Sequence, residues 1–99
     1  NHYEVVNAID FISNHTVMLV PLFSGSGLRV KIIEGMAMGK CIISTSLGAE
    51  GIPYTHKKNI LIADTKSEFI IAMKLCYNNI DKVNNIGLEA KKCALEHFC

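Results

Sequence analysis

The segment from Val20 to Ile52 constrains the fold of this chain more than any other. In order, it reads as the end of an apolar strand, a glycine-rich turn, a helix, a second apolar strand and a second turn with glycines. Strands joined through a helix run parallel, because the crossover returns the chain to the end at which the previous strand began. We therefore expect both turns at one edge of a parallel sheet, beside a helix N-terminus, where phosphates bind.

The remaining elements extend the same alternation of strands and helices. In chain order the sequence predicts a helical face over 3–13, strands over 16–21, 41–44 and 59–63, and helices over 29–38, 66–77 and from 79 or 81 to 98. Gly39 is expected to end the second helix, and Thr65 with Glu68 forms a capping box. The predicted fold class is α/β, a three-layer Rossmann-like parallel sheet, with residues 1–99 as a single domain.

For the helix over 29–38, the predicted inward face has Val30, Ile33 and Ala37 on one side. Ile32 and Met36 widen this apolar stripe. Three strands make a thin sheet, and the first residue is asparagine, so we expect a fragment of a longer protein. The missing neighbouring strands would leave an open sheet edge, which favours self-association.

Composition limits the classes of function. The chain has 99 residues, is 49% hydrophobic and 19% charged, and so is globular rather than disordered. A net charge of +1 gives no reason to expect a nucleic-acid partner. No apolar run approaches the roughly 18 residues of a membrane span. The cysteines are expected to be free thiols of a cytosolic protein, and no Cys or His pattern predicts a metal site.

The glycine turn carries the main chemical prediction. Gly25 and Gly27 would leave room for a phosphate to approach backbone N–H groups, and Arg29 and Lys31 would add positive charge. The turn fails two better-known glycine motifs. Val30 stands where the dinucleotide fingerprint needs glycine, and Gly39-Lys40 follows a helix without the Ser or Thr of a P-loop. A tight strand-to-helix turn without a ligand is the open alternative.

Glu34 allows two interpretations that the spacing leaves even. It follows Lys31 by three residues and Gly27 by seven, so the three positions share one flank of a helix that would face the turn. A carboxylate there can accept hydrogen bonds from the two hydroxyls of a ribose. The alternative is a surface ion pair between Lys31 and Glu34, worth about 0–1 kcal/mol.

These residues together resemble a known family. The helix and strand from Glu34 to Ile43 are similar to the second half of the pattern Glu-(seven residues)-Glu-Ala-Met-Ala-x-Gly-x-Pro-Val-Ile. That pattern belongs to the donor-binding half of retaining GT-B glycosyltransferases, called glycosyl transferases group 1 or family 4. The loop over 44–51 resembles the family's Thr-x-x-Gly-Ala-Glu-Gly, and 59–64 resembles its Asn-Gly-x-Leu-x-x-x-Asp. The similarity covers about residues 15 to 75.

The resemblance implies a site and a fold. The fold would be part of the C-terminal domain of a GT-B enzyme. The donor ribose would lie at Glu34, and the turn would contact the diphosphate and sugar through its amides. The implied donor-binding residues are Gly25, Ser26, Gly27, Leu28, Arg29, Lys31 and Glu34. The chain departs from the pattern at Ser26, where the family has its first glutamate, and at Gly35 and Cys41, which replace alanine and proline. No catalytic residue is assigned.

The function implied is glycosyl transfer from a nucleoside diphosphate sugar to a glycan or lipid-linked acceptor in surface polysaccharide biosynthesis. The donor is a substrate, and no cofactor or metal is expected. The parent would act in the cytoplasm, with peripheral association at the inner face of the membrane, whereas this piece alone is expected to be inactive. The alternative is a non-catalytic α/β module of the receiver type, for which Asp64 is the only acid at a suitable strand end.

Overall fold

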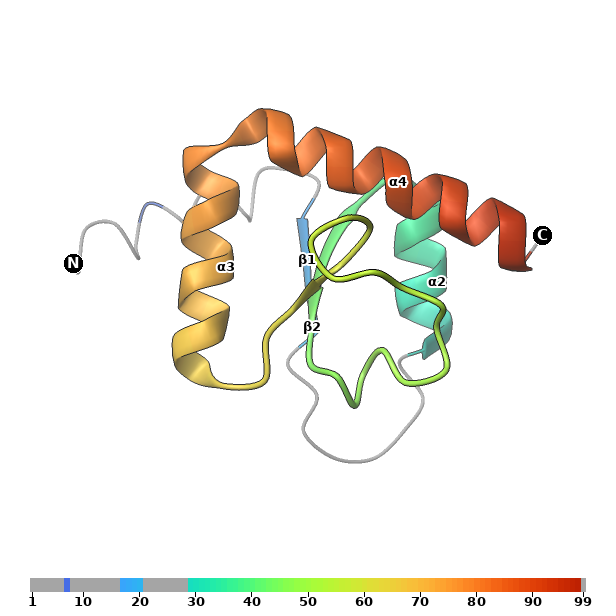
Figure 1. The fold of residues 1–99 in the computed structure, drawn as a ribbon, viewed down its shortest axis with the longest axis horizontal. Coiled ribbons are helices and arrows are strands. Elements are labelled where there is room, and N and C mark those ends of the chain that lie inside the picture. The colour runs from blue at the N-terminus through green and yellow to red at the C-terminus, as the bar shows by residue number, and fades with distance from the viewer. Residues whose placement is uncertain (1–6, 8–16, 21–28, 99) are drawn as a thin grey trace.

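The computed structural model describes residue 7, residues 17–20 and residues 29–98, and the ribbon is shown in Figure 1. The predicted helix over 3–13, apart from residue 7, and the predicted turn over 24–28 lie outside these residues. The described elements are β1 (Val17–Val20), α2 (Arg29–Ala37), β2 (Cys41–Ser44), β3 (Leu61–Ile62), α3 (Lys66–Asn78) and α4 (Ile80–Phe98). They confirm the predicted alternation of strands and helices.

The described strands form a parallel sheet in the order β1-β2-β3. Val17 pairs with Cys41 at one end of the first pair of strands, and Ile43 pairs with Leu61 in the second. The third strand is shorter than the predicted 59–63. Backbone pairing continues beyond both ends of β3. After the strand, Ala63 donates its N–H to the Ser44 carbonyl at the end of β2, and before it, Ile60 forms a parallel bridge with His56 of the preceding loop.

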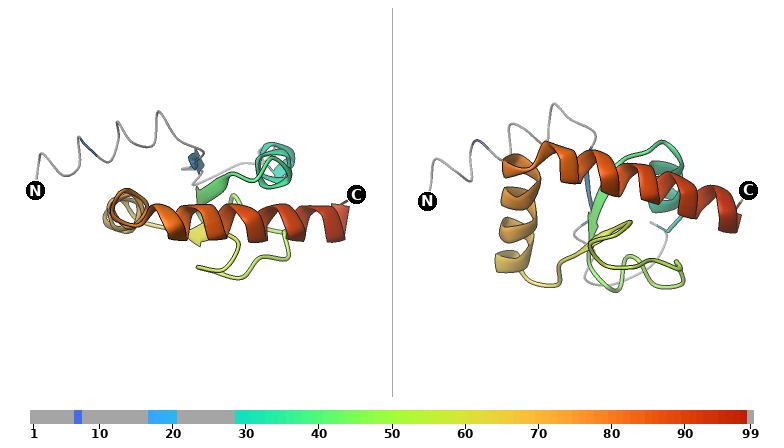
Figure 2. Two further views of the ribbon diagram at one scale, coloured as in Figure 1. Left: turned by 90° about the horizontal axis from the view of Figure 1, so that it is seen from above. Right: turned by 45° about the horizontal axis from the view of Figure 1, so that its top comes forward.

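Helices cover both faces of the sheet, which makes three layers. Figures 1 and 2 show α3 on one side of the strands and α2 on the other. Successive side chains of β2 point to opposite faces of the sheet. Cys41 and Ile43 therefore belong to the core under α3, and Ile42 belongs to the core under α2. The predicted fold class, an α/β three-layer parallel sheet, is confirmed.

The inward face of α2 contains four of the five predicted residues, since Ile33 and Ala37 pack beside Ile32 and Met36 and only Val30 does not. Ile32 and Met36 are fully buried and Gly35 lies between them, whereas Val30 is 65% exposed. A side chain at position 35 would meet the ends of Ile42 and Met18, so the absence of a Cβ lets this face approach the sheet closely. Gly39, with φ 77°, ends the helix as predicted.

The two C-terminal helices are set at an angle by a single residue. Asn79 donates its N–H to the Cys76 carbonyl at the end of α3, and its side chain accepts the N–H of Lys82 in the first turn of α4. One half of the predicted capping box of α3 is present, because Thr65 Oγ1 accepts the Glu68 N–H at 3.1 Å. The Glu68 carboxylate accepts the N–H of Asp64, one residue before the N-cap Thr65, in place of the N–H of Thr65 itself. α4 then crosses the end of the sheet at which β2 begins (Figure 1).

Candidate functional site: the carboxyl edge of the sheet

Hydrogen bonds join the ends of all three strands at one edge. Thr45 donates its N–H to the Val20 carbonyl, which ties the exit of β2 to the end of β1. Ser46 donates its N–H and its hydroxyl to the two carboxylate oxygens of Asp64, at 2.7 and 2.6 Å, which ties β2 to the end of β3. The turn after β2 therefore lies at this edge, whereas the predicted meeting of the two turns stays a prediction, because the turn over 24–28 lies outside the described residues.

The loop after β2 is a tight, internally bonded turn. Thr45 Oγ1 accepts the Gly48 N–H at 3.0 Å, and the Thr45 carbonyl accepts the Ala49 N–H. Thr45, Gly48 and Ala49 are buried, and Ile52 returns the chain to the core under α2. The loop is therefore anchored at both ends by buried residues and presents Glu50 and Gly51 to the surface.

Arg29 joins this loop to the beginning of α2. It is the first residue of the helix, and its guanidinium lies against Gly51, where a Cβ would overlap Nη1. The structure thus brings a predicted binding residue, Arg29, beside the second of the two predicted turns. The N-terminus of α2 lies at the same edge as the exits of the strands, where helix N–H groups favour an anion.

Lys31 and Glu34 are both exposed on α2. Glu34 lies on the outer face, between Val30 and Met38, which are 65% and 69% exposed. Among the described side chains, Lys31 and Glu34 form no ion pair with each other, so the predicted surface pair is absent from this structure. The remaining predicted binding residues, Gly25, Ser26, Gly27 and Leu28, lie outside the described residues.

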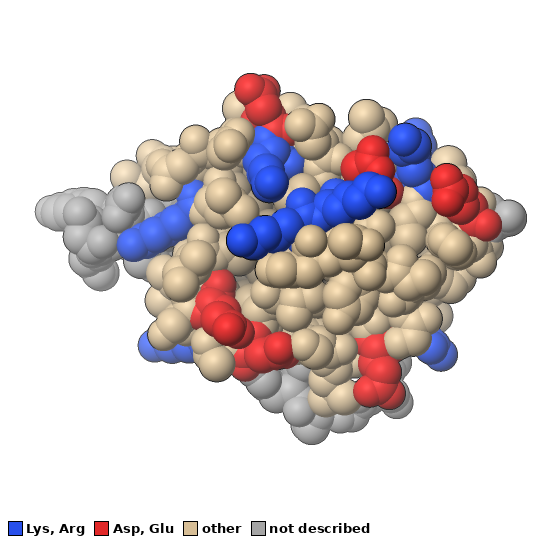
Figure 3. All heavy atoms as spheres, viewed as in Figure 1, with Lys and Arg blue, Asp and Glu red and all other residues tan. Residues whose placement is uncertain are grey.

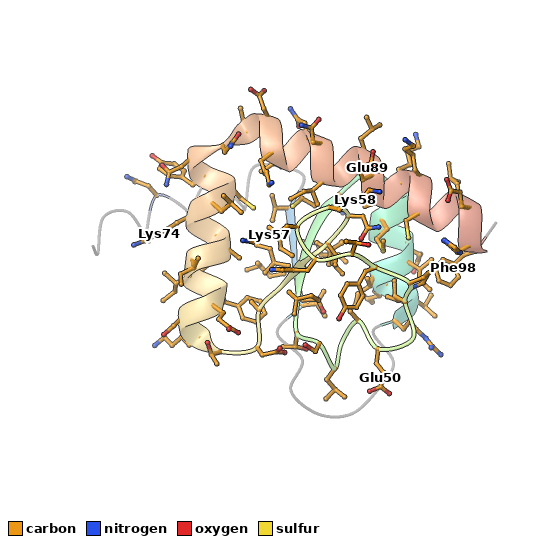
Figure 4. All side chains as sticks on the ribbon, in the orientation of Figure 1. Glu50, Lys57, Lys58, Lys74, Glu89 and Phe98 are labelled. Atoms are coloured by element: carbon orange, nitrogen blue, oxygen red, sulfur yellow. The ribbon has the colours of Figure 1, made fainter. Side chains whose placement is uncertain are left out.

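Acidic groups stand at the same edge. Figure 3 shows acidic side chains at its lower edge and long basic side chains across its middle. Glu50 points away from the sheet there (Figure 4), and Asp64 lies at the end of β3. The hydroxyl of Ser46, and then its N–H, hold the pKa of Asp64 below its usual value, so this carboxylate is ionised at neutral pH. A bound diphosphate would therefore need the positive groups of α2.

Two residues of the site were missed by reasoning from sequence. Ser46 is hydrogen-bonded to Asp64, 18 positions away in the sequence, and Gly51 is the residue against which the Arg29 guanidinium lies. The one available signal was that each follows a predicted strand at the shared edge. The pairing itself depends on strand register, which the sequence pattern does not give.

Other features of the described residues lie away from this edge. A hollow of about 310 Å³ between the 53–59 loop and α4 has walls of both charges, with Lys58, Lys92, Glu89 and Glu96 among them. No group of three or more His, Cys, Asp or Glu within the described part of the chain is placed to hold a metal ion. None of the helices described is both long enough and apolar enough to cross a bilayer.

The fold and the edge define a partial Rossmann-like α/β domain of the kind found in GT-B proteins. The chain belongs to the glycosyl transferases group 1 family, whose sequence model matches residues 3–79. This finding confirms the resemblance drawn from the motifs after β1 and β2.

A curated relative adds a genetic setting. The chain is 24% identical over 82 residues to an uncharacterized 44.6 kDa protein in the cps region of Klebsiella pneumoniae, and the match covers 83% of this chain. The chain spans about a fifth of the length of that relative, 21%. No solved structure matches the chain significantly.

Proposed function

We propose that the chain is the donor-binding part of a glycosyltransferase in surface polysaccharide biosynthesis. The enzyme transfers a sugar from a nucleoside diphosphate sugar to a glycan or lipid-linked acceptor, in a retaining reaction. The family match supports this proposal, and so does the relative described as a protein in a cps region. The parent acts on the cytoplasmic side of a membrane, associated with it peripherally.

The observation that carries the proposal is the meeting of α2 and the loop after β2 through Arg29 and Gly51. This contact places the chain's arginine and a helix N-terminus at the carboxyl edge of a parallel sheet, where ligands of such sheets bind. Arg29 and Lys31 stabilise the negative charge that develops on the leaving diphosphate. Gly25, Ser26, Gly27 and Leu28 contribute backbone amides, and Glu34 accepts hydrogen bonds from the ribose.

This piece alone does not catalyse transfer. In a GT-B enzyme the reaction takes place in the cleft between two domains, and the chain corresponds to about a fifth of its relative's length, 21%. The role that we propose for this chain within the enzyme is therefore donor binding, and we expect it to bind nucleoside diphosphates.

The test is an amide NMR titration of the chain with UDP and with GDP. We expect shifts confined to residues 24–34 and 44–51, with the better ligand indicating the donor base. Glu34→Ala should weaken that binding about 10-fold, the effect of losing a hydrogen-bonded charged group of roughly 1.5 kcal/mol. Glu96→Ala is the matched control, since Glu96 is an exposed glutamate on α4 away from the edge.

The full-length enzyme gives the second readout. Glu34→Ala should abolish most of its transfer activity while Glu96→Ala keeps it. Unchanged activity of Glu34→Ala would refute the role given to Glu34. Shifts that scatter over the whole chain, or none at millimolar nucleotide from a folded sample, would count against a donor site in this piece.

The receiver-like alternative gains no support from a specific observation. Asp64 holds Ser46 with both carboxylate oxygens, and no acidic cluster stands beside it among the described residues. A receiver needs such a cluster and a free phosphorylatable aspartate.

A further inference from the structure

The side chain of Arg29 lies on the protein surface against Gly51, and this contact point is called its seat below. A Cβ built on Gly51 would overlap Nη1 of Arg29, and the same point lies 3.4 Å from its Cζ and 3.6 Å from its Cδ. The guanidinium and the end of its stem therefore lie over the backbone at Gly51. Arg29 is the single arginine of the chain.

Hydrogen bonds hold the turn at Gly51. Ala49 donates to Thr45, Glu50 to Leu47, and Ile52 to Ala49. Thr45 and Ile52 are buried on either side of it. With φ at 86°, Gly51 adopts a conformation that L side chains rarely take. Glycine at position 51 therefore suits the backbone angle, and a side chain there would displace the end of Arg29.

We propose that Gly51 is a positioning residue for donor binding: it seats the guanidinium of Arg29 at the carboxyl edge, aimed at the donor diphosphate. This inference rests on the proposed function. A free arginine side chain samples many rotamers and loses that freedom when it binds a phosphate. An arginine already seated on Gly51 loses less, so the seat raises affinity for the diphosphate without touching it.

Two carboxylates near the edge compete with a diphosphate for the Arg29 guanidinium. Glu50 precedes Gly51, and the ionised Asp64 stands at the end of β3. An unseated guanidinium could turn toward these carboxylates and leave the diphosphate without its partner. Seating on Gly51 fixes the distance between the positive group and the N-terminus of α2, where the anion would lie.

The first experiment tests the seat without any nucleotide. Because the chain has one arginine, its Nε–H gives a single side-chain signal in a ¹⁵N spectrum. In the unaltered chain, we expect the heteronuclear NOE of the Arg29 Nε–H to be close to the values of ordered backbone amides. In Gly51→Ala the value should fall to that of a free side chain. Glu50→Ala, in the same turn, is the control that keeps both the seat and the ordered signal.

Gly51→Asn separates strain from displacement. Asparagine tolerates positive φ better than alanine does, yet its side chain still occupies the seat. Both variants should therefore release Arg29, while backbone amide shifts over 45–50 report whether the turn itself persists. An Arg29 signal that is equally mobile in all four proteins would overturn the inference.

The second experiment links the seat to the ligand through a double-mutant cycle with UDP and GDP. Gly51→Ala should weaken the affinity about 2- to 10-fold when Arg29 is present, the effect expected for ordering one long side chain. In the Arg29→Ala background the same change should alter the affinity less than about 2-fold. Equal losses in both backgrounds would show that Gly51 acts on the turn alone and would overturn the positioning role.

The two arms also separate this inference from the proposed function. An ordered Arg29 that Gly51→Ala releases, with no binding of either nucleotide, would refute donor binding and leave the seat established. Binding of a nucleotide with a mobile Arg29 would refute the seat and leave donor binding in place. In the full-length enzyme, Gly51→Ala should raise KM for the donor more than it lowers kcat.

Discussion

Asp64 shows how a single residue fastens the candidate site. Its two carboxylate oxygens take the N–H and the hydroxyl of Ser46, and its own N–H donates to Glu68 at the start of α3. The carboxyl ends of β2 and β3 and the first turn of α3 are thereby joined at one point. Because the bonds are made to the ionised carboxylate, they hold the pKa of Asp64 low.

That shift predicts an acid-dependent loss of stability. A carboxyl group whose pKa is lower in the folded than in the unfolded state stabilises the fold fully above the unfolded value, about 3.9. This contribution disappears as the pH falls through the lower folded-state pKa. Asp64→Asn, which keeps one acceptor and loses the charge, should therefore lower the urea midpoint at pH 7 and flatten its decline below pH 5.

Urea unfolding at pH 7, 5 and 3 measures both effects. Glu50→Gln is the control, since Glu50 is an exposed acid on the same edge. If Asp64→Asn and the unaltered chain had parallel pH profiles, the bonds to Ser46 would contribute nothing that depends on the charge.

Individual site residues were only partly predictable from the sequence. Arg29 was expected at the carboxyl edge of the sheet, and it lies at that edge, whereas phosphate binding there stays a prediction. Its contact with Gly51 was not expected, because the two residues are 22 positions apart and meet only through the path of the turn after β2. The Ser46–Asp64 bonds depend in the same way on the register of β2 against β3. Local patterns identify such residues as candidates and leave their partners open.

At the scale of elements, α2 shows why a helix can be predicted while its buried face is not. Apolar residues occur at 30, 32, 33, 36, 37 and 38, nearly all round the helix. Two neighbouring faces therefore satisfy the same three-and-four spacing, and the predicted stripe spanned both. Its residues pack in or against the core with the exception of Val30. Gly35 decides between them, because the face that contains it can approach Met18 and Ile42 most closely. Space, rather than hydrophobicity, selects the face.

The packing of α2 against α4 depends on another glycine. Gly87 lies in the middle of α4, and a Cβ there would overlap the Gly39 carbonyl oxygen, with the carbonyl carbon at 3.1 Å. Gly87→Ala gains helix propensity of about 1 kcal/mol. It also forces the backbone of Gly39 to move, and overpacking typically costs about 1–3 kcal/mol. We expect a net destabilisation of up to about 2 kcal/mol by urea unfolding.

Two matched variants make this prediction specific to the helix contact. Asn84→Ala, at an exposed position of α4, changes propensity alone and should be neutral or slightly stabilising. Gly35→Ala meets only the flexible ends of Met18 and Ile42, at 2.9 Å, so its loss should be smaller than that of Gly87→Ala. A Gly87→Ala variant as stable as Asn84→Ala would mean that α4 shifts freely against Gly39.

At the scale of the whole molecule, the described residues form two cores, one on each face of the sheet. The core under α3 and the core under α2 meet at β2, whose residues are all buried. The parallel sheet with helices on both faces was predictable, because the alternation of strands and helices allows few other arrangements. The course of α4 across the end of the sheet was not predicted, because it depends on the single-residue joint at Asn79 and on the close contact at Gly87.

The thiols of Cys41 and Cys76, which both lie in the core under α3, test whether that core opens separately from the core under α2. Cys41 on β2 and Cys76 on α3 are 0% and 1% exposed, and they are hydrogen-bonded to each other. That bond and burial raise the pKa of the Cys41 thiol, and the burial of both sulfur atoms keeps a reagent from either thiol until α3 leaves the sheet. Both cysteines should therefore react with iodoacetamide about 10³-fold more slowly in the native chain than in urea.

Peptide mass spectrometry over time measures each cysteine separately. Cys93 serves as the internal comparison, because it lies on α4 at 7% exposure with its thiol bonded to the Pro53 carbonyl. If the molecule opens as one unit, the labelling rates of Cys41, Cys76 and Cys93 all rise with urea along the slope of global unfolding. If Cys41 and Cys76 react at rates that urea barely changes while the rate of Cys93 follows global unfolding, α3 opens by itself. Since Asp64 joins the start of α3 to the carboxyl edge through Glu68, such local opening would also loosen the candidate site.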